Sequence, residues 1–205
     1  MPAFLIILFS AICFRSFAQD ADINKLAEKF RAISDYKAIR ADFLQTRYLK
    51  DLDMHVKIHG EMICEKNGRL RWEVKSPIRS ITIIGSTELK HFDRETGKTA
   101  MIQSDKIPWL QILKNCMGDW ISGDPDRLSR RFELLTKDDH TFRLFPKETQ
   151  LKTIFKTVEI RADVQFRGIE SITIEEKSGD QLEIRFIKVQ KNPVLPEKLW
   201  QMPSS

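Results

Sequence analysis

The sequence predicts a mainly β fold, in which one large curved antiparallel sheet of about ten or eleven strands is covered by a few helices. Three observations support this prediction. Apolar and polar residues alternate with a period of two along most of the chain, which is typical of half-buried strands. Short turn sequences separate these segments. Few stretches have apolar residues at helical spacing, so few helices are expected.

The N-terminal residues indicate a secretory signal peptide. An apolar run from Phe4 to Phe14 is followed by Ser16-Phe17-Ala18, which fits cleavage after Ala18. The run is too short to cross a membrane as a helix. We therefore expect residues 1–18 to be removed and residues 19–205 to form a single soluble domain. Removing Arg15 with this segment reduces the 34 basic residues to 33, against 29 acidic residues, so the mature chain is mildly basic.

The first predicted element of the mature chain is an amphipathic helix over residues 23–33. Apolar side chains recur there at three- and four-residue intervals, behind Asp20 or Asp22 as the cap. We expect its apolar face to lie on the sheet. A strand around Ile39–Leu49 follows.

The segment from Met54 to Lys75 predicts a hairpin with one apolar and one charged face. Apolar side chains occupy alternate positions in both of its strands. A two-residue turn would set the apolar face of one strand against the charges of the other. A three-residue loop, Lys66-Asn67-Gly68 with Gly68 in the left-handed conformation, avoids this conflict. The register then pairs Cys64 with Leu70 and Met62 with Trp72.

Shorter alternating segments between turn residues predict the remaining strands. They are Ile81–Ile84, Leu89–Asp93, Thr99–Gln103, Arg131–Thr136, Thr141–Phe145, Thr153–Arg161, Ile169–Glu175 and Leu182–Val189. A helix interrupts the series from Pro108, because apolar residues up to Trp120 fall on one helical face, and Gly118 is expected to end it. A second short helix is predicted to begin at Asp124-Pro125.

Cys64 and Cys116 leave two alternatives open. In an oxidising compartment they could form a disulfide. Both also lie on apolar faces of their predicted elements, where free thiols behave as small apolar side chains. Geometry decides between the two.

Other functional classes find little support in the sequence. Charges are interleaved along strands, without the basic and aromatic ribbon that single-stranded nucleic acid needs. His55 and His59 would lie about 13 Å apart on a strand, at about 3.3 Å per residue, which is too far to share a metal ion. Neither a Gly-x-Ser-x-Gly elbow nor a phosphate-binding glycine loop is present, so an enzyme is not expected.

With these elements in place, the chain resembles the periplasmic outer-membrane lipoprotein carriers, the LolA-like family. The resemblance rests on Ala41–Thr46, which is similar to the family's Phe-x-Gln opening strand, on Gly60–Pro77, and on Gly118-Asp119 in the later helix. It covers nearly the whole mature chain. Alternation alone favours a filled core. The resemblance implies instead an incomplete, half β-barrel of about 11 strands, with lid helices over an open apolar cavity.

The resemblance also implies which residues would line that cavity and its lid. The cavity set comprises Met54, Val56, Ile58, Met62, Leu70, Trp72, Val74, Ile81, Ile83, Phe92 and Met101. The underside of the lid comprises Trp109, Ile112, Leu113 and Cys116.

Carriers of this family accept a triacylated lipoprotein from an inner-membrane transporter and pass it to an outer-membrane acceptor. The resemblance therefore implies a periplasmic monomer that binds acylated cargo and uses no cofactor or metal. The sequence departs from the family at Lys66-Asn67, where relatives often have an arginine followed by proline that ties the lid shut. Lys66 is the candidate latch, although lysine forms fewer directional hydrogen bonds than arginine. Two alternatives follow: a carrier of a glycolipid, or a periplasmic module that senses lipid or lipoprotein.

Overall fold

The computed structural model describes residues 22–66, 68–85, 87–103 and 108–203, with the backbone alone for residues 108–114. The predicted signal peptide and Asp20 lie outside these residues. No helix within the described part of the chain is long and apolar enough to span a membrane.

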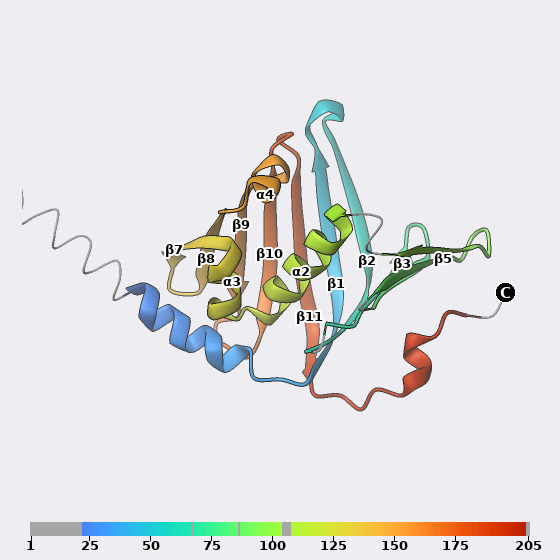
Figure 1. Cartoon of the computed structure of the whole chain (residues 1–205), viewed down its shortest axis with the longest axis horizontal. Coiled ribbons are helices and arrows are strands. Elements are labelled where there is room, and N and C mark those ends of the chain that lie inside the picture. Colours follow the sequence, from blue (N-terminus) through green and yellow to red (C-terminus); the bar gives the residue numbers. More distant parts are fainter. Residues whose placement is uncertain (1–21, 67, 86, 104–107, 204–205) are drawn as a thin grey trace, which may run out of the picture.

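The fold is one open antiparallel sheet of 11 strands, in the order β6-β5-β4-β3-β2-β1-β11-β10-β9-β8-β7 (Figure 1). The strands are β1 Ala38–Leu49, β2 Met54–Glu65, β3 Leu70–Ser76, β4 Ser80–Ile84, β5 Glu88–Asp93, β6 Thr99–Gln103, β7 Phe132–Asp138, β8 Thr141–Pro146, β9 Phe155–Ala162, β10 Ile169–Glu176 and β11 Gln181–Lys191. The mainly β prediction is confirmed, and each predicted strand is present with ends that differ by a few residues.

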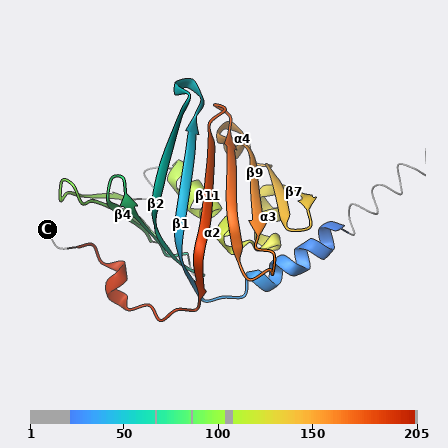
Figure 2. The ribbon, with the colours of Figure 1, turned by 180° about the vertical axis from the view of Figure 1, so that it is seen from behind.

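Helices lie on one face of this sheet, which we call the inner face. They are an N-terminal helix over residues 22–33, α2 Pro108–Ser122, α3 Pro125–Arg131 and α4 Thr149–Ile154. Two short 3-10 helices, η1 Lys50–Leu52 and η3 Glu197–Trp200, lie in connections. Figure 1 shows α2 crossing in front of the sheet, and Figure 2 shows the opposite, outer face without it.

The register of the β2–β3 hairpin is as predicted. Cys64 pairs with Leu70 and Met62 with Trp72. The Glu65 amide donates to the Arg69 carbonyl at 2.9 Å, and Gly68 has a φ of 93°. The hairpin therefore places its large apolar side chains on the inner face.

The helices differ from prediction in two respects. α2 continues through Gly118 and ends at Ser122, where Gly123 takes a φ of 64°. Gly118 was therefore wrongly predicted as the end of this helix. α4 was not predicted, and it delays the start of β9 to Phe155. By contrast, α3 begins as predicted, with the Asp124 side chain accepting from the Asp126 amide.

A filled core lies between the helices and the strands β7 to β11. Phe30 of the N-terminal helix contacts Phe142 of β8 with ring centroids 4.7 Å apart. Trp120 of α2 lies 5.4 Å from Phe155 and is fully buried. This half of the inner face is thus occupied by the chain's own side chains. Cys64 and Cys116 join the same core as free buried thiols, so the disulfide alternative is not realised.

A second apolar cluster lies on the outer face and is covered by the C-terminal segment. This outer cluster consists of Ile63, Ile81, Ile83, Phe92 and Trp200. The Arg69 guanidinium lies 4.5 Å from the centre of the Trp200 ring. Since the cluster draws on β2, β4 and β5, these three strands carry apolar side chains on both faces.

Candidate functional site

The inner face of β1 to β3 carries a stacked aromatic pair that is supported by a glycine. Phe43 and Trp72 stack with ring centroids 3.9 Å apart and planes inclined by 27°. Gly60 lies between their strands, pairing with Phe43 on β1 and with Val74 on β3. A Cβ atom at position 60 would lie 2.7 Å from Phe43 Cζ and would also collide with the Glu73 carbonyl oxygen. The absence of a side chain at position 60 is what lets the Phe43 ring extend over β2 to Trp72.

From this pair, an apolar track runs along the inner face toward the β1–β2 turn. Met62 and Leu70 are buried at one end, Ile58, Trp72 and Val74 are half-buried, and Met54 at the other end is 44% exposed. The track consists of seven predicted cavity residues: Met54, Val56, Ile58, Met62, Leu70, Trp72 and Val74. The structure therefore brings these seven together on one face, with exposure increasing toward the turn.

The other four predicted cavity residues are not on this face. Ile81 pairs with Glu73 and Ile83 with Arg71, so both point to the outer side. Phe92 pairs with Ile81 and lies in the outer cluster. Met101 pairs with Lys90 on the same side and is 65% exposed. The prediction that Ile81, Ile83, Phe92 and Met101 face the cavity is wrong, because side chains directly opposite across a sheet share a face.

The alternate residues of β4 to β6 take their place on the inner face. Ile84 pairs with Leu70 and continues through Leu89 to Ile102, all in contact with the core. Thr82 pairs with Trp72, and its Oγ1 lies 2.9 Å from His91 Nδ1. Sequence reasoning missed these residues, although the predicted pairing of β2 and β3, extended one strand further, would have identified them.

The predicted lid residues lie on α2. Cys116 is buried in the core, as expected of the inner side of this helix. The side chains of Trp109, Ile112 and Leu113 lie outside the described residues. In Figure 1, the N-terminal part of α2 lies across β1 and its C-terminal part nearer β10. The helix therefore crosses the sheet beside the half-exposed track.

The C-terminal half of α2 is held by a buried charge. Asp119 is 6% exposed and pairs with Arg127 of α3 at 2.9 Å, while Arg131 Nε lies 3.5 Å from its other oxygen. Burial raises the pKa of Asp119, and the two arginines oppose this only in part. The ion pairs fasten α2 to α3 at the end of α2 remote from the track.

Lys66, the candidate latch, contacts a different element. Its amide donates to the Lys37 carbonyl at 2.9 Å, and its ammonium lies 3.4 Å from the Ser34 carbonyl. Both contacts join the β2–β3 turn to the segment after the N-terminal helix. A role for Lys66 in lid closure remains a prediction.

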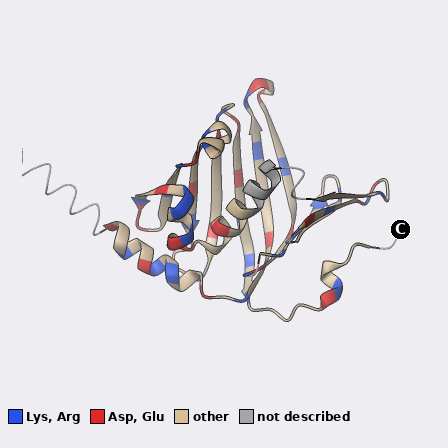
Figure 3. Ribbon diagram, viewed as in Figure 1, with Lys and Arg blue, Asp and Glu red and all other residues tan. Residues whose placement is uncertain are grey.

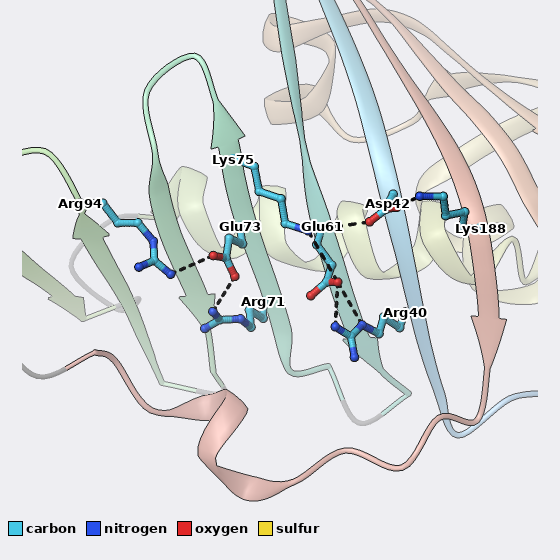
Figure 4. Close-up of polar contacts among 8 residues, drawn as sticks. All are labelled: Arg40, Asp42, Glu61, Arg71, Glu73, Lys75, Arg94 and Lys188. Carbon is cyan, nitrogen blue, oxygen red and sulfur yellow. Dashed lines mark hydrogen bonds and ion pairs between the residues drawn. The ribbon is translucent and has the colours of Figure 1, made fainter.

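The outer face behind the track is charged. Arg40 lies 2.8 Å from Glu61, and Glu73 is held by both Arg71 and Arg94 (Figure 4). Lys188 lies 3.0 Å from Asp42 in the neighbouring row. Figure 3 shows mixed charge of both signs over the strands. No group of three or more potential metal ligands occurs among the described residues.

Comparison with known proteins supports this interpretation of the fold. A family model described as "Outer membrane lipoprotein carrier protein LolA" matches residues 34–203. The chain is 22% identical over 178 residues to an outer-membrane lipoprotein carrier protein from Legionella pneumophila (strain Corby), covering 86% of this chain and 82% of the relative. It is 23% identical over 176 residues to one from Coxiella burnetii, covering 84% and 80%.

A solved structure has the same fold. It is an uncharacterized conserved protein from Thermus thermophilus, with a TM-score of 0.53 and 7% identity over 91% of this chain and 94% of the other. At this level of identity the likeness concerns the fold alone.

Proposed function

Since the chain belongs to the LolA family of outer membrane lipoprotein carrier proteins, we propose that it binds the acyl chains of lipoproteins, or of a related acylated lipid, and ferries them from the inner to the outer membrane. The cargo binds along the inner-face track between Trp72 and Met54, beside α2. Residues 1–18 direct the chain to the periplasm and are removed near Ala18, leaving one carrier domain over residues 19–205.

The half-exposed track is the observation that carries this proposal. A folded protein gains by burying apolar side chains, yet Ile58, Trp72 and Val74 stay half-buried while the neighbouring core is closed. Contiguous apolar surface of this kind marks binding sites. Directly behind the track, the outer face of β2 and β3 carries the ion pairs of Glu61 and Glu73, so the inner face is the one suited to hydrocarbon.

The energetics of acyl chains explain why a carrier is needed. Three chains of about sixteen carbons expose roughly 35 kcal/mol of apolar surface to water, at about 0.8 kcal/mol per methylene. Free diffusion between membranes is therefore negligible. A carrier must shield the chains and then release them, and moving α2 away from the track would do both, because the free energy of opening reduces the net affinity.

The names of the relatives support a lipoprotein as the class of cargo. Outer-membrane lipoprotein carriers work on lipoproteins. We propose a triacylated lipoprotein as cargo, an inner-membrane transporter as donor and an outer-membrane acceptor as recipient. The carrier acts as a monomer, with no nucleotide, metal or catalytic step.

A glycolipid carrier is the second candidate. The feature that favours it is Lys66, which stands where relatives often have arginine and binds carbonyls next to the N-terminal helix. A weaker latch would admit cargo of a different shape. The third candidate is a lipid-sensing module on the same fold. Such a module would bind a protein partner stably and would not pass cargo to an acceptor.

Native mass spectrometry of protein purified gently from its own host tests the proposal. We expect a bound acylated molecule in the mass spectrum. Trp72→Asp should abolish its binding, because removing a carboxylate from water to lie against hydrocarbon costs free energy. The matched control is Leu44→Asp, which places the same charge on the outer face of β1 at a residue that is 46% exposed. Loss of cargo in both variants, or in neither, with the far-UV circular dichroism unchanged, would count against the track.

A further inference from the structure

Strands β10 and β11 separate at one end of the sheet. Their pairing covers Ser171–Glu175 on β10 and Gln181–Arg185 on β11. Beyond Arg185, the described pairs join β11 only to β1, as far as Lys191. Figure 2 shows the two strands diverging toward this end. A break in the sheet therefore lies between the end of β11 and the start of β10.

A bulge in β11 lies beside this break. The register of β1 with β11 shifts between Arg40 and Asp42, and Lys188 takes a φ of 53°. A left-handed lysine costs conformational energy, so the surrounding structure must hold it there. The bulge beside the break is therefore part of the folded structure of β11.

A cavity of about 600 Å³ occupies the break. Its apolar wall consists of Ile169, Phe186 and Val189. The same three residues border a small apolar recess whose far side is formed by Met62 and by Ile121 of α2. The volume of the cavity, about 600 Å³, is within the range of small-molecule sites. The cavity therefore leads from solvent to apolar surface beneath the end of α2.

Charged residues surround the mouth, and all but one have a partner of opposite sign. Arg167 pairs with Asp163 at 2.8 Å, Glu170 lies 3.3 Å from Arg161 Nε, and Lys188 pairs with Asp42.

Lys191 differs from these residues. It is half-buried, and its ammonium donates to the Ile33 carbonyl at 2.9 Å. Within the described ranges, no carboxylate lies within ion-pairing distance of it. Burial lowers the pKa of Lys191, as expected for a cation that has lost water. A positive charge beside the apolar wall of this cavity favours a ligand with an anionic head and a hydrocarbon body.

We propose that the break between β10 and β11 is a second binding site, which takes a long-chain carboxylate with its head on Lys191 and its chain along Ile169, Phe186 and Val189. The site is centred away from Trp72 of the proposed cargo track, although Met62, a track residue, borders the recess behind it. Trp72 lies on β3, and β2 and β1 intervene before β11. A resident fatty acid would close the break while cargo occupies the track.

Displacement of a fluorescent fatty acid from the purified protein tests this site. Oleate should displace the probe, while uncharged oleyl alcohol and free inorganic phosphate should not compete at the same concentration. Lys191→Met should weaken oleate binding roughly tenfold, the effect of losing one charge-assisted contact, and Lys191→Arg should retain it. Lys57→Met, an exposed lysine on β2, is the matched control.

A blocking variant locates the binding. A Cβ at Gly168 would meet Val189 at an ordinary 3.6 Å, so Gly168→Leu should fold and fill the cavity. Oleate binding should be lost in Gly168→Leu and retained in Trp72→Asp. Equal binding of oleate and oleyl alcohol, full affinity in Lys191→Met, or loss of all oleate binding in Trp72→Asp would each overturn the second site. The last result would leave the cargo track intact as a proposal.

Discussion

Arg71 donates a 2.8 Å hydrogen bond to Glu73 two residues along β3, although their side chains are only 10% and 17% exposed. Arg94 of the β5–β6 turn donates to the other Glu73 oxygen at 2.9 Å (Figure 4). Burial alone would raise the pKa of Glu73, but the hydrogen bonds from the two arginines outweigh it, and the pKa is lowered.

This arrangement predicts acid-sensitive stability. The pKa of Glu73 is lower in the folded chain than in the unfolded one, so its ionised carboxylate stabilises the fold. This stabilisation is complete above about pH 5, just above the pKa of an ordinary glutamate, and is lost as the pH falls through the folded pKa. Glu73→Gln should therefore lower the free energy of unfolding by about 1 to 2 kcal/mol at pH 7 and by much less at pH 3. Urea titrations at both values measure the difference.

Glu183→Gln is the control for that experiment. Glu183 pairs with Arg185 on the same outer face, but their side chains are 42% and 54% exposed. Such exposed pairs contribute little, so the loss should stay below about 0.5 kcal/mol at either pH. A Glu73→Gln effect that does not change with pH would mean that packing, and not charge, stabilises this position.

Gly60→Ala should destabilise the chain by about 3 kcal/mol, because the new Cβ has to displace the Phe43 ring and the β3 backbone. Denaturant titration measures the loss. Gly85→Ala is the matched control, since a Cβ there would meet the Glu88 carbonyl at 3.5 Å. If both substitutions cost the same, the tight approach of Phe43 to Gly60 is not what constrains the strand.

Gly118→Ala should stabilise the chain by about 0.5 to 1 kcal/mol, since residue 118 lies inside α2 and a Cβ there would meet nothing within 4 Å. Gly123→Ala should do the opposite, because Gly123 has a φ of 64° and its Cβ would lie 2.6 Å from Ile169 Cδ1. Thermal unfolding of the two variants distinguishes a helix interior from a helix end. Destabilisation by Gly118→Ala would restore the sequence-based end of the helix.

Trp200→Ala should cost about 3 kcal/mol and should increase binding of a hydrophobic dye, because it uncovers the outer cluster. Acyl-chain retention should be unchanged, since the track lies on the other face. Arg69→Lys, which keeps the charge over the ring, should cost under about 1 kcal/mol. Loss of cargo in Trp200→Ala at a temperature where the chain stays folded would show that the two faces are coupled.

Cys64 and Cys116 should resist alkylation in the folded chain and react together on unfolding. Burial raises the pKa of each thiol to about 12, so thiolate is scarce near neutral pH. Counting the thiols labelled by iodoacetamide, with and without urea, measures this. Unfolded protein that takes up no label without a reductant would instead indicate a disulfide.

Local alternation predicted the strands, and turn chemistry predicted the β2–β3 register, because both depend on residues near one another in sequence. β4 shows where this fails. Its sequence Ser80–Ile84 has isoleucine at three of five positions, so alternation does not decide which side faces inward. The decision depends on the C-terminal segment, which returns more than a hundred residues later to cover the outer side.

The ion pairs that join α2 to α3 were also not evident from the sequence. Asp119, Arg127 and Arg131 lie within thirteen positions, yet nothing in their spacing shows that a turn at Gly123 brings them together. The break between β10 and β11 depends on a left-handed lysine, and lysine gives no such signal in sequence. Sequence reasoning recovered the apolar track and its local hairpin, and it missed the contacts that side chains make between other elements.

The position of Trp200 has a consequence for biogenesis. Synthesis and export proceed from the N-terminus, so Ile63, Ile81, Ile83 and Phe92 emerge long before the segment that shelters them. Until then these four apolar side chains are exposed in the nascent chain, so a chaperone that holds the unfolded chain would be useful during secretion. A premature stop codon near Pro196 would make that exposure permanent, and such a product is expected to aggregate or to be degraded.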